Sequence, residues 1–131
     1  MDFTDDVLRL LDGQNFAQLG TVNHGGQPHI DTVWIGRKEK QLIVATTRRT
    51  TKAANLVANN KAYIVVVNKD NPYEQLQIQA KLVDIIDDSN MAIADAISLK
   101  YIDKPFPARH YKERIALMFL PTKIRYHKAK I

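Results

Sequence analysis

The chain has 131 residues, of which 45% are hydrophobic and 25% charged, and this size and composition are typical of one globular domain. It contains no cysteine, which excludes disulfides, thiolate metal sites and a cysteine nucleophile. No apolar run approaches the ~20 residues of a membrane-spanning helix, and the acidic start MDFTDDVLRLL lacks the cations of a signal peptide. We therefore expect a soluble, cytoplasmic protein that does not enter a membrane.

The net charge of +5 is concentrated near the C-terminus. Residues 1–99 carry 10 Lys and Arg against 12 Asp and Glu, whereas residues 100–131 carry 9 against 2. Such an excess could attract polyanions, but no aromatic-and-basic nucleic-acid motif accompanies it. We favour a solvated basic surface, and a nucleic-acid-binding barrel is the weaker alternative.

The first part of the chain is typical of a helix followed by three strands. Thr4 can cap the helix, and Gly13 can end it. Alternating polarity on both sides of the turn HGGQP predicts a hairpin, and the charged GRKEK at 36–40 predicts a second turn. The expected elements are a helix over 3–11 and strands over 15–23, 29–35 and 41–47.

The rest of the chain predicts more strands and two short helices. KAYIVVV is apolar without alternation, as in a central strand, whereas 73–87 alternates and places three glutamines on one polar face. Ser89 can cap a helix to about Leu99, and Pro121 should break the last strand. The expected elements are a helix over 51–59 with Ala53, Leu56 and Val57 on one side, strands over 61–67 and 73–87, a helix after Ser89, an irregular or partly helical segment over 104–114, and strands around Pro121. Short antiparallel strands with few helices indicate an α+β, mainly β domain over 1–131, built as a closed or partly closed barrel.

The segment TTRRTTK, where the third strand passes into a helix, combines hydroxyls and cations without an acid. The start of a helix presents unpaired N–H groups and can hold an anion. Lys52 would lie in the first turn, where a cation opposes the helix dipole, and this mismatch favours a bound phosphate. The alternative is an ordinary threonine-capped helix beside a solvated turn. The glycines of a Walker loop are missing.

Three stretches in this order carry a family resemblance: GQPHIDTVWI, QLIVATTRRTTKAANL and YEQLQIQAKL. Together they resemble the pyridoxamine 5′-phosphate oxidase-like family of FMN-binding split β-barrels. The resemblance is best over residues 3–87. It implies a split barrel that forms a homodimer, with FMN in a groove at the dimer interface.

The resemblance also implies roles for individual residues. The phosphate-binding segment corresponds to Thr46, Thr47, Thr50, Thr51 and Lys52. The segment that lines the isoalloxazine ring corresponds to Asp31, Thr32, Val33 and Trp34, and a flavin-contacting glutamine corresponds to Gln75. Trp34 has core or interface packing as its alternative role. Because the flavin would carry the hydride chemistry, no catalytic side chain is assigned.

The chain also departs from the oxidase pattern. Asp31 stands where the oxidase has an arginine, Thr51 replaces a basic residue, Gln79 replaces a glycine, and LPTKIRYHKAKI does not match the substrate-binding segment. We therefore expect a smaller relative, an FMN-dependent oxidoreductase that uses a small-molecule substrate and an electron donor. The alternatives are a deazaflavin-dependent reductase, whose coenzyme tail would meet Lys123, Arg125 and Lys128, and a non-catalytic flavin- or haem-binding stress protein.

The histidines offer little further chemistry. His24 and His29 flank the hairpin turn without a third ligand at a metal-binding spacing, so we expect no metal site. His110 and Tyr111 could line an active site, but their surroundings favour a surface loop.

Overall fold

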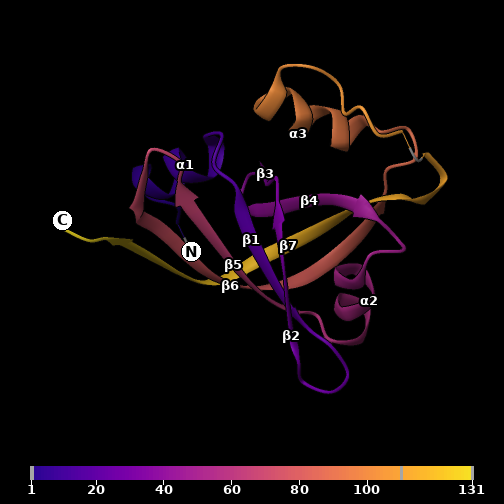
Figure 1. Cartoon of the computed structure of the whole chain (residues 1–131), viewed down its shortest axis with the longest axis horizontal. Coiled ribbons are helices and arrows are strands. Elements are labelled where there is room, and N and C mark those ends of the chain that lie inside the picture. Colours follow the sequence, from indigo (N-terminus) through magenta and orange to yellow (C-terminus); the bar gives the residue numbers. More distant parts are fainter. Residues whose placement is uncertain (1, 110, 131) are drawn as a thin grey trace.

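A computed structural model describes residues 2–109 and 111–130, which form one antiparallel sheet wound into a split β-barrel (Figure 1). The strands lie in the order β2-β1-β5-β6-β7-β4-β3. Within these residues, no helix is long and apolar enough to cross a membrane. The elements are α1 Asp5–Asp12, β1 Ala17–Val22, β2 Pro28–Val33, β3 Gly36–Lys38, β4 Gln41–Thr47, α2 Thr51–Ala58, β5 Lys61–Asn68, β6 Asn71–Asp87, α3 Ala92–Ile102, η1 Tyr111–Glu113 and β7 Arg114–Lys128.

Helix α1 confirms its prediction. The Thr4 hydroxyl accepts a hydrogen bond from the Val7 amide at 3.3 Å, and the helix ends at Gly13. Val7, Leu10 and Leu11 are buried. This apolar face covers one end of the barrel core, which contains side chains such as Leu19, Leu42, Ile64, Ile78 and Phe119.

The predicted hairpin of β1 and β2 is confirmed, with Ala17 opposite Val33 and Val22 opposite Pro28. The prediction of a simple turn over 36–40 is partly wrong, because Gly36–Lys38 forms the short strand β3 against β4. Charged side chains do not prevent this pairing, since the ladder is made by the backbone. Glu39, with a positive φ of 54°, closes the tight turn.

Strand β5 lies between β1 and β6, as expected for a central strand. The strand does not alternate in polarity, but it does alternate in burial, because Ala62, Ile64 and Val66 are buried and the residues between them are not. In a barrel only one sheet face meets the core, so even an apolar strand buries alternate side chains.

The expected break at Pro121 is also wrong, because β7 is one continuous strand from Arg114 to Lys128. Two register shifts accommodate the proline and the curvature. Thr122 is an extra residue in β7, beside the pairing of Ala80 with Pro121, and Val83 is an extra residue in β6. A proline fits within a strand at such a bulge because its missing N–H is not needed there.

The two later helices differ from their predictions in detail. In α2, Ala53 and Leu56 are buried, but Val57 is 74% exposed instead of sharing their side. Helix α3 is capped by Asp88 and not by Ser89. The Asp88 carboxylate accepts hydrogen bonds from the amides of Ile93 and Ala94, both at 2.9 Å. The helix runs past Leu99 to Ile102.

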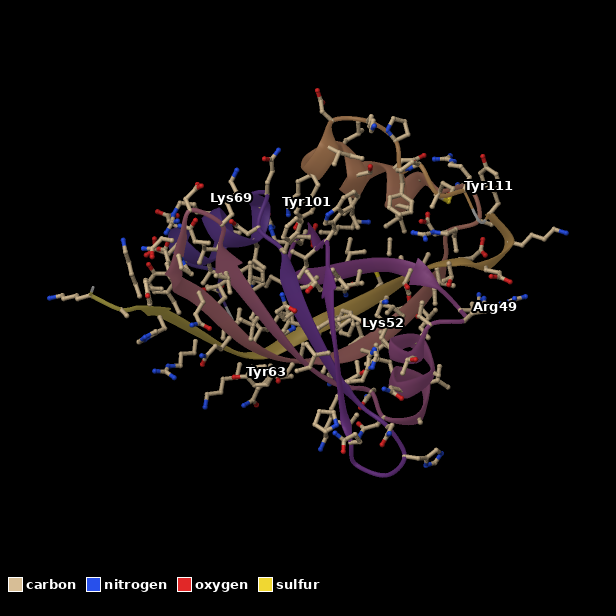
Figure 2. The ribbon with its side chains drawn as sticks, viewed as in Figure 1. Arg49, Lys52, Tyr63, Lys69, Tyr101 and Tyr111 are labelled. Carbon is tan, nitrogen blue, oxygen red and sulfur yellow. The ribbon has the colours of Figure 1, made fainter. Side chains whose placement is uncertain are left out.

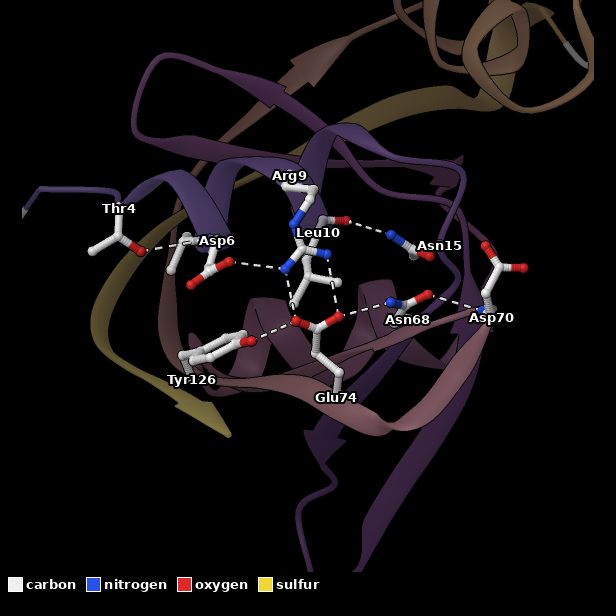
Figure 3. A network of polar contacts seen from close by, with 10 residues as sticks. Thr4, Asp6, Arg9, Leu10, Asn15, Asn68, Asp70, Glu74 and Tyr126 are labelled. Atoms are coloured by element: carbon white, nitrogen blue, oxygen red, sulfur yellow. Dashed lines mark hydrogen bonds and ion pairs between the residues drawn. The ribbon is translucent and has the colours of Figure 1, made fainter. Parts of the chain in front are cut away.

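A buried carboxylate joins α1 to the long strands (Figure 3). Glu74 on β6 is 2% exposed and accepts hydrogen bonds from Arg9 of α1 at 2.6 and 3.2 Å. Asn68 donates to the same carboxylate at 2.7 Å, and the Tyr126 hydroxyl of β7 also donates to it. These hydrogen bonds from Arg9, Tyr126 and Asn68 lower the pKa of Glu74 to about 2.

Candidate functional site

A cavity of about 280 Å³ lies where the end of β2, the start of α2 and helix α3 meet. Its walls are mostly apolar, and they contain two cations, Lys52 and Arg114. Figure 2 shows Lys52 on the α2 side of the sheet and Tyr101 projecting from α3 towards the strands. The lining residues are Phe16, Thr32, Val33, Trp34, Ala45, Lys52, Ala94, Ile97, Phe106 and Arg114.

Aromatic side chains form one wall of the cavity. Trp34 stacks on Tyr101 with the ring centres 5.1 Å apart and the planes 6° from parallel. Phe106 meets Trp34 edge to face at 5.7 Å, and Phe16 also stacks on Tyr101. The Tyr101 hydroxyl donates to the Asn15 carbonyl at 2.6 Å. These contacts fix the plane of Trp34, so a flat apolar surface faces the cavity.

Lys100 ties the end of α3 to α1 and to the segment between β2 and β3. Its amine donates to the carbonyls of Leu11 and Ile35, at 2.6 and 2.7 Å. Burial lowers the pKa of Lys100 to about 8. Because both acceptors belong to other elements, these hydrogen bonds hold the end of α3 beside the segment that connects β2 to β3.

The loop after α3 is held over the cavity by Asp95. The Asp95 carboxylate accepts from the Phe106 amide at 3.0 Å and pairs with Arg109 at 2.6 Å. The Arg109 hydrogen bond keeps the pKa of Asp95 below its usual value. Phe106 therefore has an anchored backbone where its ring meets Trp34.

Lys52 reaches the cavity from the first turn of α2, and its side chain is only 12% exposed. Its amine lies 3.3 Å from the Asp31 carboxylate, and His29 Nε2 lies 3.1 Å from the same oxygen. Burial opposes ionisation of Asp31, but hydrogen bonding to His29 and the charge of Lys52 outweigh it and lower the pKa of Asp31. The cation in the first turn thus has a partner within the chain.

The threonines of TTRRTTK organise the start of α2. The Thr50 hydroxyl accepts from the Ala53 amide at 3.4 Å and donates to the Thr47 carbonyl at 3.0 Å. Thr46 donates to Thr50 at 3.4 Å, and Thr51 is exposed in the first turn. The segment is therefore a capped helix start, and the first N–H groups of such a helix have no partner within the helix.

The two arginines of the segment lie on the surface. Arg49 pairs with Glu113 at 2.7 Å, and the Arg48 amide donates to the Glu113 carbonyl at 3.0 Å. Glu113 ends η1, so these contacts connect the turn before α2 to the loop that leads into β7. The Arg48 side chain adds a positive charge near the start of α2.

Arg114 begins β7 directly opposite Thr47 and is 6% exposed. Its guanidinium lies 5.0 Å from the centre of the Phe106 ring. Among residues 2–109 and 111–130, no group accepts a hydrogen bond from its Nε. Burial lowers the pKa of Arg114 below its usual value. The cavity therefore contains a buried cation that lacks a full set of partners.

The structure brings part of the predicted site together. Thr32, Val33, Trp34 and Lys52 line one cavity. Asp31 adjoins it through its contact with Lys52, and the threonines Thr46, Thr47, Thr50 and Thr51 lie in or beside the turn that leads into α2. Gln75 lies elsewhere, on β6 between Val67 and His127, and does not line this cavity.

Several lining residues were not predicted from the sequence. Phe106 and Arg114 fall in the segment expected to be irregular or partly helical, and Ala94 and Ile97 fall in a helix with no assigned role. The flanking prolines of Phe106 were the one available signal, because they mark an aromatic residue in a loop. Of the predicted alternatives, Tyr111 is half exposed and stacks with Arg109, and His110 lies outside the described residues. The described part of the chain contains no group of three side chains that could hold a metal ion.

A second hollow of about 690 Å³ lies on the outer face of β1, β2, β5 and β6. Ile30 and Tyr63 line it and are 66% and 44% exposed. In Figure 2, Tyr63 lies below the strands and Tyr101 above them. Gln79 lines the same hollow, on the polar face predicted for β6.

A split antiparallel barrel with a cationic helix start beside an apolar slot defines the class of flavin-binding split barrels. A family model described as pyridoxamine 5′-phosphate oxidase matches residues 3–128, so the chain belongs to this family. No curated protein sequence matches the chain.

Solved structures support the same assignment. The chain is similar to an F420 reductase, with 26% identity, a TM-score of 0.84, and coverage of 90% of this chain and 94% of that one. General Stress Protein 26 from Bacillus anthracis has 19% identity and a TM-score of 0.74, with coverage of 94% and 92%. A pyridoxamine 5′-phosphate oxidase-related, FMN-binding protein from Nostoc punctiforme has 19% identity and a TM-score of 0.63, with coverage of 86% and 73%. The fold is thus that of proteins that bind a flavin or a deazaflavin.

Proposed function

We propose that this protein binds a flavin-type coenzyme, FMN or a deazaflavin, and acts as an oxidoreductase on a small molecule. The observation that carries the proposal is that Lys52, at the start of α2, lines the same apolar slot as Val33 and Trp34. Such a coenzyme needs both an anchor for its phosphate and an apolar surface for its ring.

In this proposal the chain's own residues bind and orient the coenzyme. Lys52 and the N–H groups at the start of α2 hold the phosphate, with the exposed hydroxyl of Thr51. Thr32, Val33 and Trp34 line the ring, and the aromatic wall excludes water from it. The coenzyme, when bound, supplies the hydride chemistry.

We further propose that a second copy of the chain completes the site. The cavity of about 280 Å³ lies below the range of roughly 300–1,000 Å³ typical of pockets that enclose a drug-sized ligand. The exposed Ile30 and Tyr63 form an apolar area on the outer sheet face that suits such a copy. Gln75, which does not line the cavity of its own chain, would then reach the coenzyme of the partner.

The choice between FMN and a deazaflavin rests on different observations. The neighbour named F420 reductase and the basic residues near the C-terminus favour a deazaflavin with an acidic tail. The FMN-binding neighbour favours FMN at the level of the fold.

The test of coenzyme binding is gel filtration of the purified protein with each coenzyme in turn. Coenzyme absorbance that elutes with the protein supports the proposal, and its absence with both coenzymes contradicts it.

A second candidate is a coenzyme carrier without turnover of its own. It is favoured by the fold of a protein named General Stress Protein 26. Stopped-flow mixing of the reduced, loaded protein with a two-electron acceptor separates the candidates. Oxidation faster than that of the free coenzyme indicates an enzyme, whereas an unchanged rate indicates a carrier.

A further inference from the structure

We propose that the cavity beside α3 takes a flat, conjugated carboxylic acid, and that Arg114 binds its carboxylate. This inference rests on the proposed function, because it takes the acid to be the substrate of the coenzyme-dependent reaction. It goes further by naming a substrate class and a specificity-determining residue that is not among the expected coenzyme contacts.

The first argument is the unpaired Nε of the Arg114 guanidinium. Arg114 is 6% exposed, and its Nε has no hydrogen-bond acceptor among the described residues. A buried N–H donor without an acceptor is costly, so a ligand that brings acceptor oxygens is favoured at this position. A carboxylate matches the guanidinium best, because the two planar groups can form a pair of parallel charge-assisted hydrogen bonds.

The second argument is that the neighbouring carboxylates are already engaged. The charges of Asp88 and Asp95 both act on Arg114. Asp88 caps α3 through two amides at 2.9 Å, and Asp95 binds Arg109 and the amide of Phe106. Glu113, next to Arg114 in sequence, pairs with Arg49. Because these carboxylates bind other groups, the Nε of Arg114 remains available to an external anion.

The third argument is the shape of the surroundings. The Phe106 ring lies 5.0 Å from the guanidinium and meets Trp34 edge to face. Trp34 is in turn fixed by stacking on Tyr101. A rigid aromatic wall next to a fixed cation selects a ligand that is flat and carries its negative charge at one end.

The coenzyme phosphate is a less suitable partner for Arg114. The start of α2 already offers Lys52, hydroxyls and free helix N–H groups for a phosphate. Arg114 pairs with Thr47 in the β4–β7 ladder, but its guanidinium lies 5.0 Å from the centre of the Phe106 ring and lines the cavity with Ala94 and Ile97 of α3. We therefore assign the guanidinium to the second ligand and not to the coenzyme.

The test uses the full chain, as purified and saturated with FMN, with cinnamate and its uncharged amide cinnamamide as probes. Calorimetry measures both affinities. The indole N–H resonance of Trp34, the single tryptophan, reports whether the probe enters the cavity. We expect cinnamate to bind at least about tenfold more tightly than cinnamamide and to shift the indole resonance.

The variant Arg114→Met should abolish this preference, and Arg114→Lys should keep part of it, since a lysine retains the charge but not the planar fork. Lys38→Met, which removes an exposed cation on β3, is the matched control and should leave the preference unchanged. Thermal melting establishes that each variant is folded, and Arg114→Lys gives a second reading if Arg114→Met is not.

Three results would overturn the inference. The first is equal binding of cinnamate and cinnamamide to the wild-type chain. The second is a loss of affinity for FMN but not riboflavin in Arg114→Met, which would assign Arg114 to the phosphate. The third is an equal loss for FMN and riboflavin, which would assign it to the ring. Failure of the proposed function looks different: no coenzyme binds, while the preference for cinnamate and its dependence on Arg114 persist.

Discussion

Lys52 and Asp31 form an ion pair at the edge of the cavity, where a phosphate would compete with the aspartate for the lysine. The Lys52 amine lies 3.3 Å from the Asp31 carboxylate, and the two side chains are 12% and 31% exposed. The proposal that Lys52 anchors the coenzyme therefore makes opposite predictions for the two residues.

Lys52→Ala should weaken FMN binding by about 1.5–3 kcal/mol, or about 10- to 150-fold in Kd, because a charge-assisted hydrogen bond is lost. Riboflavin, which has no phosphate, should bind the variant and the wild type equally well. Asp31→Asn should instead strengthen FMN binding, because it frees Lys52 and removes a negative charge. Titration of flavin fluorescence measures the Kd of each variant for FMN and the Kd of Lys52→Ala for riboflavin. An unchanged Kd for FMN in Lys52→Ala would rule out the anchoring role.

Glu74 shows how one buried carboxylate can influence stability across the pH range. Its folded-state pKa of about 2 lies below the ordinary value of 4.5. Because the folded state binds this proton more weakly than the unfolded chain, the ionised carboxylate stabilises the fold above about pH 4.5. That contribution is lost as the pH falls towards about 2.

Glu74→Gln should lower the free energy of unfolding by about 1–3 kcal/mol at neutral pH, as Arg9 is left with a weaker acceptor. The difference from wild type should shrink as the pH falls from about 4.5 towards about 2. Urea unfolding at several pH values measures this difference in the free energy of unfolding. Asp2→Asn, whose carboxylate is 99% exposed beside Lys40, is the control and should change nothing measurable. A difference that is constant with pH would contradict this account.

At the scale of elements, α3 decides whether the cavity exists, because it supplies Ala94 and Ile97 to the lining and carries the loop with Phe106. It is held at both ends. Asp88 caps its start, and Lys100 ties its end to the carbonyls of Leu11 and Ile35. The position of α3 over the cavity therefore depends on polar contacts at both of its ends.

Asp88→Ala should destabilise α3 by about 0.5–2 kcal/mol, the usual range for a lost helix cap. Hydrogen exchange should show faster exchange of the Ile93 and Ala94 amides, which lose their acceptor. Ser89→Ala is a matched control, because the serine hydroxyl binds Asp87 and not the helix. Equal effects of the two substitutions would show that Asp88 does not cap the helix.

At the scale of the whole molecule, the two hollows lie at different places on the barrel, the smaller beside α3 and the larger over the outer face of β1, β2, β5 and β6. The smaller contains the cations and aromatic rings, and the larger exposes Ile30 and Tyr63. In the proposed dimer, the larger hollow binds a partner that completes the smaller one. Association and coenzyme binding are then thermodynamically linked, so each strengthens the other.

Tyr63→Arg should shift the protein to the monomer, because the symmetric interface would contain two buried, unpaired charges. The same variant should retain FMN less well on gel filtration. Light scattering gives the mass directly. Leu99→Arg alters a side chain of α3 that is 52% exposed and should leave the mass unchanged. A wild-type chain that is monomeric with FMN bound would contradict the proposed dimer.

The sequence alone predicted helix α1, the hairpin of β1 and β2, strand β4 and most of the long strand β6. These elements depend on caps, turn residues and polarity alternation, which act between neighbours in the chain. The same local signals, with the resemblance, also selected Thr32, Val33, Trp34 and Lys52, which the structure places on one cavity. The short strand β3, the continuity of β7 through Pro121 and the cap of α3 were missed, because each depends on a partner segment.

The tertiary structure decided the remaining features of the site. Asp31 meets Lys52 across 21 positions, and Arg114 comes to lie opposite Thr47 through the pairing of β4 with β7. Whether a buried charge has a partner depends on such long-range register. Local periodicity predicts which face of an element a side chain occupies. It carries no information about which residues of distant segments come to lie next to that side chain.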